Sequence, residues 1–126
     1  MLRLGIPVLG VTDLERAAAF WSAALDLVPT GEWQNENWRT LSHRDGSGPA
    51  LGLLRSESPA EHHPRLHLDL FVESADEQRT EVQRLLALGA KDPHWDSYPR
   101  EPDFVVLADP DDNVFCVVDL SHAPSS

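Results

Sequence analysis

The sequence predicts an α+β fold in which two βαβββ modules curve into an incomplete β-barrel with their helices outside. Three observations predict this fold. A strand, a helix-capping motif and an amphipathic helix follow one another twice along the chain. Each copy then closes with a strand, an Asp-containing turn and a short apolar strand. An offset of about 61 residues relates the copies, so that Ile6 corresponds to His67 and Val8 to Asp69. Such a barrel leaves a cavity on its inner side.

Length and composition describe one globular domain. The chain has 126 residues, which is enough for an ordinary core, and its contents of 41% hydrophobic and 25% charged residues are those of a folded protein. We expect a single domain over residues 1–126, with repeat one at 1–55, a linker at 56–64, repeat two at 65–120 and a tail at 121–126.

Charge and cysteine content limit the partners and the compartment. The formal net charge of −11 argues against nucleic acid and anionic membranes and favours a neutral or cationic ligand, although solubility alone is the plainer explanation. The apolar stretch Leu4–Val11 is too short to span a membrane and has no basic leader or cleavage site. With one cysteine there is no disulfide framework, so we expect a cytoplasmic location.

The first module is expected to begin with an interrupted strand over Leu2–Val11. Thr12 and Glu15 have the spacing of a capping box in which Thr12 is the cap. The following helix ends at Pro29 and carries one apolar stripe, formed by Leu14, Ala17, Ala18, Trp21, Ala24, Leu25 and Val28.

The rest of this module is predicted to be a hairpin and one more strand. The hairpin covers Glu32–Ser42, with its turn at Gln34–Asn37, and contains two tryptophans. A turn rich in glycine then leads to a short apolar strand over Ala50–Arg55. The polar linker follows this strand.

The second module opens with Arg65–Val72, which alternates strictly between apolar residues and the side chains of Arg65, His67, Asp69 and Phe71. The apolar side is expected to pack against a helix, which leaves His67 and Asp69 together on the opposite face. A second capping box spans Ser74–Glu77. The remaining elements are a helix that presents Val82, Leu85 and Leu86 and ends at Gly89, a Pro-rich connection over Lys91–Asp103, and strands over Phe104–Ala108 and Val114–Leu120.

Four stretches of the chain share an order and spacing with a known superfamily. They are Val11-Thr12-Asp13-Leu14-Glu15-Arg16 leading into Ala19-Phe20-Trp21 and Leu25, then His67-Leu68-Asp69-Leu70, then Leu88-Gly89-Ala90, and last Asp109-Pro110-Asp111-Asp112-Asn113-Val114-Phe115-Cys116. In these stretches the chain resembles the vicinal oxygen chelate superfamily, which includes glyoxalase I, extradiol dioxygenases and bleomycin- and fosfomycin-resistance proteins. The resemblance is strongest to its glyoxalase-like branch and implies the glyoxalase/bleomycin-resistance/dioxygenase fold.

In the metal-using members of that superfamily, side chains from the first and last strands of both repeats hold one divalent cation. The resemblance places these positions at Ile6, near Gly52 or Leu53, at His67 and at Cys116. Only His67 is of the expected ligand type, and a catalytic site usually needs three protein ligands. We therefore expect no cofactor and no metal at these positions. A divalent ion held by His67 and Cys116 with help from Asp69 or a mobile loop is the alternative.

Candidate ligand contacts lie on the inner face and in the loops that wall the cavity. They are Trp33, Trp38, His67, Asp69, Trp95, Phe104 and Cys116. Aromatic walls with acidic groups suit a flat or cationic organic ligand, whereas ordinary packing is the alternative for each tryptophan. The histidine of this set can move a proton near neutral pH, so His67 and Asp69 are also the catalytic candidates; a hydrogen-bonded core pair is the alternative.

Three other features have both a functional and a plain explanation. Cys116 lies in an apolar strand and is expected to be an inert thiol unless His67 activates it. The two histidines of His62-His63-Pro64 resemble a pair of metal ligands. Without partner ligands nearby, a solvated loop is the plainer explanation. His94-Trp95-Asp96 is a candidate lid over the cavity.

The function that these features favour is binding of a small organic molecule, neutral or cationic, without an intact metal site; sequestration of a drug is one version. The alternatives are a metal-dependent lyase, isomerase or dioxygenase that uses His67, and a structural dimerisation module with a filled barrel. A homodimer is expected in each case, because the edges of such half-barrels are commonly covered by a partner.

Overall fold

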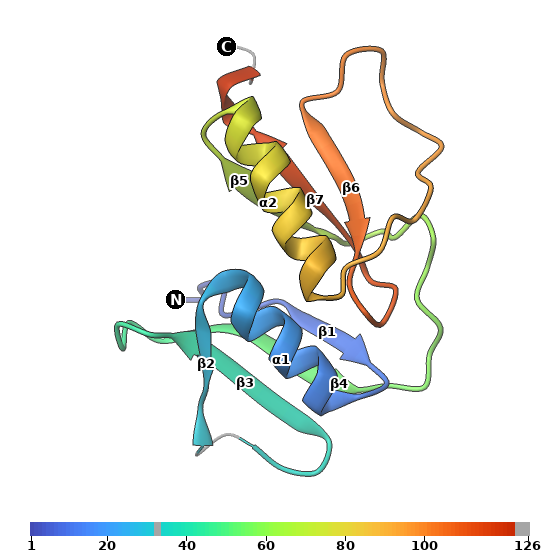
Figure 1. Ribbon diagram of the computed structural model, residues 1–126. Helices are drawn as coiled ribbons and strands as arrows, with labels where there is room; N and C mark the ends of the chain where they lie inside the picture. Colours follow the sequence, from blue (N-terminus) through green and yellow to red (C-terminus); the bar gives the residue numbers. More distant parts are fainter. Residues whose placement is uncertain (32–33, 123–126) are drawn as a thin grey trace. The chain divides into compact units, whose positions relative to one another are not determined.

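The computed structural model describes residues 1–31 and 34–122. The chain divides into two compact units, Met1–Ala60 and Glu61–Ser126, and the division falls inside the linker expected at 56–64. Each unit combines one helix with one small sheet (Figure 1). The predicted α+β class is therefore confirmed.

The first unit contains a four-stranded sheet with the order β1-β4-β3-β2. Its elements are β1 (Val8–Val11), α1 (Leu14–Leu25), β2 (Leu27–Pro29), β3 (Trp38–His43) and β4 (Pro49–Arg55). β1 runs parallel to β4, whereas the other neighbours are antiparallel. α1 covers one face of this sheet, where it packs against β2, β3 and β4 (Figure 1).

Helix α1 has the predicted apolar stripe but ends earlier than predicted. Trp21 is fully buried, as expected for a core residue. The helix ends because Asp26 adopts a left-handed conformation (φ 53°), which turns the chain away from the helix axis. The prediction that Val28 belongs to the helix is wrong, since Val28 pairs with Ser42 between β2 and β3.

The N-terminal cap of α1 is also one residue later than predicted. The Asp13 carboxylate, rather than Thr12, accepts a hydrogen bond from the backbone N–H of Arg16, at 3.1 Å. Glu15 pairs instead with Arg39 (Nη2 to Oε1, 2.6 Å). Two adjacent residues with good capping side chains compete here, and the extended backbone of Asp13 (φ −128°) decides the outcome.

The first strand and the hairpin differ in extent from the prediction. The strand begins at Val8 rather than Leu2, although the carbonyl of Pro7 still accepts from the Gly52 N–H at 3.0 Å. β3 pairs antiparallel with both β2 and β4, and among the residues that the structure describes an isolated bridge joins Asn35 to Trp38 across the predicted turn. Residues 32–33, which include Trp33, lie outside the described residues.

The second unit contains a three-stranded sheet with the order β5-β7-β6. Its elements are β5 (Leu68–Val72), α2 (Ala75–Leu88), β6 (Phe104–Ala108), β7 (Val114–Asp119) and a 3₁₀ turn at Leu120–His122. The predicted two-module fold is confirmed, and within residues 61–122 the remaining strand of the second βαβββ module is represented by a bridge alone. A single bridge from Lys91 to Ala108 is formed at the start of the connection between α2 and β6. Prolines in that connection prevent a longer ladder, because proline has no N–H to donate.

The cap of α2 confirms the second capping box. Ser74 Oγ accepts from the Glu77 N–H at 3.1 Å, while Glu77 Oε2 accepts from the Glu73 N–H at 3.2 Å. Gly89 ends the helix with φ 121°, a conformation that favours glycine. Leu85 is buried against the sheet, as predicted.

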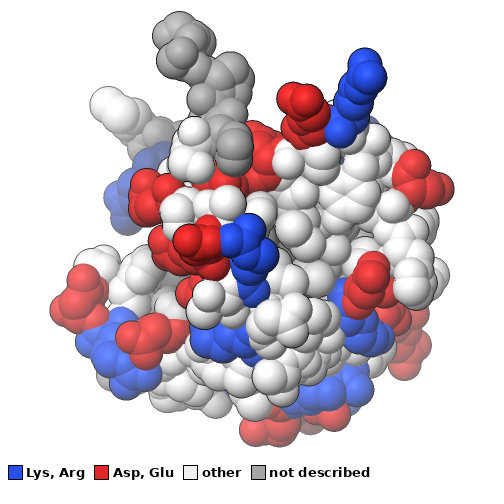
Figure 2. Space-filling model, turned by 45° about the horizontal axis from the view of Figure 1, so that its top comes forward, with Lys and Arg blue, Asp and Glu red and all other residues white. Residues whose placement is uncertain are grey.

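Charged side chains of both signs are interspersed on the face that Figure 2 shows. Ion pairs join Arg44 to Asp26 and Lys91 to Asp112, at 3.1 and 2.5 Å. Neither α1 nor α2, nor any other helix among residues 1–31 and 34–122, is long and apolar enough to cross a membrane.

Candidate functional site

A concave pocket of about 510 Å³ lies on the sheet of the second unit. Its walls are mainly apolar and comprise Pro64, Trp95, Phe104, Val106, Val114 and Val118. Its polar groups are His63, His67, Asp69, Asp103 and Cys116. A pocket of this size and composition can enclose much of a small organic molecule.

The strand register brings the polar groups of the pocket together. Asp69 on β5 lies opposite Cys116 on β7, and Cys116 lies opposite Val106 on β6. Side chains on one face of a sheet recur at every second residue, so Phe104 and Val118 join this face. His67 lies just before β5, which begins at Leu68 rather than at Arg65. The predicted shared face of His67 and Asp69 is confirmed.

His67 and Asp69 form a hydrogen-bonded pair at the surface of the pocket. His67 Nε2 lies 3.0 Å from Asp69 Oδ1, and the two side chains remain 43% and 47% exposed. The carboxylate fixes the orientation of the ring and leaves the pair open to a bound molecule. Chemically, this pair can bind a polar group or exchange a proton with it.

Cys116 is buried and protonated. Burial is the main cause that raises the pKa of its thiol from 9.0 to about 11, and the charge of Asp69 and a hydrogen bond to it act in the same direction. An ordinary thiol with its pKa raised in this way is a poor nucleophile at neutral pH. Asp69 is thus the charged neighbour that adds to the effect of burial on the pKa of Cys116. This effect is opposite to the activation by His67 that the sequence left open.

The first unit has a pocket of its own, about 590 Å³ in volume. It is lined by Ile6, Thr30, Trp38, Thr40, Ser42, Gly46, Gly48 and Pro49. The pairing of Val8 with Gly52 in β1 and β4 is equivalent to that of Asp69 with Cys116. Gly52 is therefore the counterpart of Cys116. Leu53 is fully buried and does not line this pocket.

The four-ligand metal set implied by the resemblance does not fit these residues. Ile6 and Gly52 carry no donor atom. The ring of Trp38 lies over Gly52, since a Cβ there would come within 2.5 Å of its Cη2 atom. Trp38 Nε1 donates to Thr40 Oγ1 at 2.7 Å, which holds the ring in that place. The first unit thus offers an indole where such a site would need ligands.

The second unit does bring three potential ligand atoms together. The imidazole of His67, the carboxylate of Asp69 and the thiol of Cys116 lie within 4.8 Å of one another. Asp69 is the residue that the sequence indicated as a possible third ligand beside His67 and Cys116. The thiol must lose its proton before it can act as a ligand.

The predicted ligand contacts are divided between the two pockets. His67, Asp69, Trp95, Phe104 and Cys116 line the pocket of the second unit, whereas Trp38 lines that of the first. The sequence did not single out Val106 and Val118, although alternation from Phe104 and Cys116 would have placed them on the same face. His63 and Asp103 come from irregular segments, for which the sequence holds no such periodic signal.

Comparison with known families and structures gives a consistent result. The chain belongs to the glyoxalase-like domain family, which matches residues 7–118. This places it in the vicinal oxygen chelate superfamily. A comparison with curated proteins found no match.

Solved structures with the same fold include three proteins whose names indicate a function or family. A glyoxalase/bleomycin resistance protein/dioxygenase family enzyme from Burkholderia phytofirmans PsJN is 16% identical, with a TM-score of 0.69 over 91% of this chain and 96% of that one. The fosfomycin resistance protein FosX from Listeria monocytogenes is also 16% identical, with a TM-score of 0.70 over 94% and 91%. A glyoxalase-related enzyme from Fulvimarina pelagi is 19% identical, with a TM-score of 0.67 over 94% and 88%. The chain therefore has the glyoxalase/bleomycin-resistance/dioxygenase fold.

Proposed function

We propose that the protein binds a small organic molecule in the pocket of the second unit. The observation that carries this proposal is the composition of that pocket, in which apolar walls surround the hydrogen-bonded pair of His67 and Asp69. Apolar walls supply the affinity for such a molecule, and a few polar groups fix its orientation.

A planar ligand that is neutral or cationic suits this pocket best. Asp69 and Asp103 are the two carboxylates in its lining, and the protonated Cys116 is neutral. Trp95 and Phe104 offer aromatic faces, which attract both flat rings and cations. The formal net charge of −11 acts in the same direction over longer distances.

Binding is proposed to need no metal of the type that the superfamily uses. Ile6 and Gly52 supply no ligand, and Trp38 occupies the space beside Gly52. One structure with this fold is named for bleomycin resistance, and the two carboxylates of the pocket suit a basic compound. Sequestration of a basic organic compound is accordingly the form of binding that we propose.

The test uses a panel of planar organic cations with matched neutral and anionic analogues. Tryptophan fluorescence and thermal shift would report binding, with and without a chelator. Cations are expected to bind best, and Asp69→Asn should weaken them by about ten-fold while sparing the neutral analogues. Asp45→Asn, at an exposed turn of the first unit, is the control. Preference for anions, or loss of binding on chelation, would contradict the proposal.

The hydrogen bond between His67 and Asp69 favours an enzyme as the second candidate. A histidine oriented by a carboxylate can act as a general acid or base in a lyase or isomerase reaction. In that case His67→Gln would abolish turnover but leave binding of the same compound nearly unchanged. Equal effects on binding and on any turnover would instead favour a binding protein.

We also propose a cytoplasmic homodimer. Large apolar side chains are exposed on or beside the edge strands β1 and β5, among them Val8 at 42% and Phe71 at 64%. A partner copy would remove this surface from water. Light scattering on the eluted peak of a sizing column would give the mass directly. Phe71→Ser should shift it towards the monomer if β5 takes part.

A further inference from the structure

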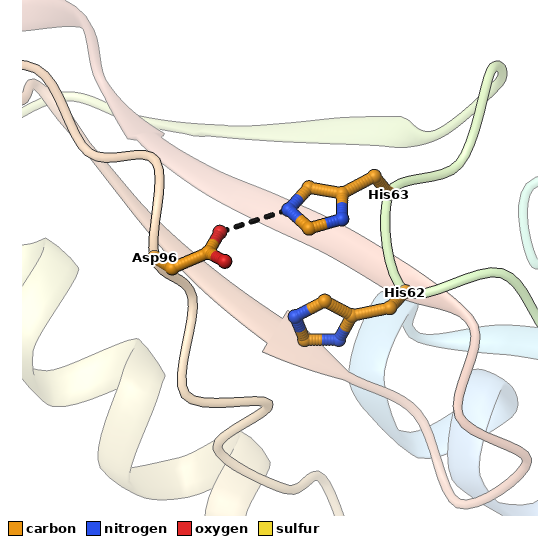
Figure 3. Close-up of side chains that lie close together, drawn as sticks. All are labelled: His62, His63 and Asp96. Atoms are coloured by element: carbon orange, nitrogen blue, oxygen red, sulfur yellow. Dashed lines mark hydrogen bonds and ion pairs between the residues drawn. The ribbon is translucent and has the colours of Figure 1, made fainter.

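A second group of potential ligands lies beside the pocket of the second unit. His62 and His63 belong to the segment that precedes β5, and Asp96 belongs to the connection between α2 and β6 (Figure 3). In Figure 3 both imidazole rings extend from their segment towards the carboxylate. One ligand atom from each of the three residues lies within 4.8 Å of the others.

Aromatic packing holds the two imidazoles in place. Their ring centroids are 4.6 Å apart with the planes at 88°. The indole of Trp95 lies 4.8 Å from the ring of His63 and 5.9 Å from that of His62. Trp95 follows His94, whose left-handed conformation (φ 55°) produces a local reversal of the chain. The fold of this connection therefore places the indole of Trp95 against the rings of His62 and His63.

The carboxylate of Asp96 is set opposite the rings. His63 Nε2 lies 2.8 Å from Asp96 Oδ1, and Ser97 Oγ donates to the same oxygen at 2.9 Å. His63 and Asp96 remain 52% and 64% exposed, which leaves them accessible to a solute.

We propose that His62, His63 and Asp96 bind a divalent transition-metal ion of the Zn²⁺ class. Two imidazole nitrogens and one carboxylate oxygen suit Zn²⁺, Co²⁺, Ni²⁺ and Cu²⁺, whereas Mg²⁺ and Ca²⁺ prefer oxygen ligands alone. The 2.8 Å between His63 Nε2 and Asp96 Oδ1 is a hydrogen-bond distance, and the two atoms would move apart to roughly 3.3 Å around a tetrahedral ion with bonds of about 2.0–2.1 Å. Small rotations of His62 would complete a three-ligand set with a water in the fourth position.

An ion at this site would affect the structure at the edge of the pocket. His63, Pro64 and Trp95 also line the pocket of the second unit. An ion held by both segments would cross-link them and fix the indole at the edge of the pocket. The site uses none of the groups His67, Asp69 and Cys116, and it does not depend on the function proposed above.

The test is a titration of untagged protein with Co²⁺, followed by displacement with Zn²⁺. We expect one equivalent of Co²⁺, with visible d–d absorption and no thiolate-to-cobalt charge-transfer band. His63→Gln and Asp96→Asn should each weaken binding by at least about ten-fold. His43→Gln is the control, because His43 is exposed at the end of β3 in the first unit and lies outside the cluster. Its affinity should equal that of the parent protein.

A second measurement locates the ion independently of affinity. Bound Co²⁺ should quench the fluorescence of Trp95, and Trp95→Phe should remove this quenching while retaining the absorption bands. Circular dichroism would confirm that each variant is folded. Loss of binding in His67→Gln or Cys116→Ser, a thiolate charge-transfer band, or equal affinity in all the histidine variants would overturn the proposal.

Discussion

Asp69 lies directly opposite Cys116 in the parallel pairing of β5 with β7. The carboxylate and the thiol thus share one face of the sheet, where burial and the charge of Asp69 together raise the pKa of Cys116 to about 11. Cys116, which the resemblance places at a metal position, is therefore kept neutral by burial and by Asp69. The measurable consequences concern reactivity and stability.

The first prediction concerns alkylation of Cys116. The thiol should react slowly with iodoacetamide at pH 8, because little thiolate is present so far below a pKa of about 11. Asp69→Asn should lower this pKa and speed the reaction several-fold, whereas burial, the larger cause, keeps the pKa above 9.0. Mass spectrometry of timed samples measures the rate. Asp103 lines the same pocket, and the control variant Asp103→Asn should leave the alkylation rate unchanged.

The second prediction concerns stability at alkaline pH. The folded pKa of Cys116, about 11, exceeds the ordinary value of 9.0, so the unfolded chain loses the thiol proton first as the pH rises. The stabilising effect is fully present below pH 9 and is lost between pH 9 and 11. Between pH 9 and pH 11, the free energy of unfolding should decrease by about 1–2 kcal/mol more in the parent protein than in Cys116→Ala. Urea unfolding at each pH measures this difference. Identical slopes in the two proteins would rule out this coupling.

The third prediction concerns the contact of Trp38 with Gly52. A methyl group at residue 52 would come within 2.5 Å of Trp38 Cη2 and 2.8 Å of its Cζ2, so Gly52→Ala must displace the ring. We expect a loss of about 1–3 kcal/mol in the free energy of unfolding. Adding Trp38→Leu should remove most of the extra cost of Gly52→Ala. A simple sum of the two single effects would show that the ring is not the obstacle.

The fourth prediction compares the helix caps. Asp13→Ala and Ser74→Ala should each cost about 1 kcal/mol, because each side chain accepts a hydrogen bond from the first turn of its helix. Thr12→Ala should cost under about 0.5 kcal/mol, since Thr12 is exposed and does not cap α1. Urea unfolding of the three variants checks the order. A larger cost at Thr12 than at Asp13 would restore the capping box that the sequence predicts.

The fold class could be predicted because its signals are local. Alternation marks β5, the apolar stripe marks α1, and the Ser74–Glu77 cap marks the start of α2; each depends on residues close together in the chain. The end of α1 could not be predicted, because the stripe continues to Val28 whereas Asp26 turns the backbone. The extent of pairing in the second module was also not predictable. Among the described residues, the prolines between Lys91 and Phe104 limit pairing there to a single bridge.

The candidate site was only partly predictable. Alternation alone placed His67 and Asp69 on one face, and the hydrogen bond between them confirms this. The proximity of Cys116 to Asp69 depends on the register of two strands separated by α2 and β6. The cluster of His62 and His63 with Asp96 depends on two irregular segments, which carry no periodic signal.

The sequence by itself determined two strand–helix modules, their family and a face with ionisable groups, since side-chain periodicity and capping act over a few residues. Only the tertiary structure decided that burial and Asp69 together raise the pKa of Cys116, that Trp38 lies over Gly52, and that Asp96 lies close to His62 and His63. These contacts join residues far apart in the chain. Strand register and loop packing set their distances, and neither is encoded in any short stretch of residues.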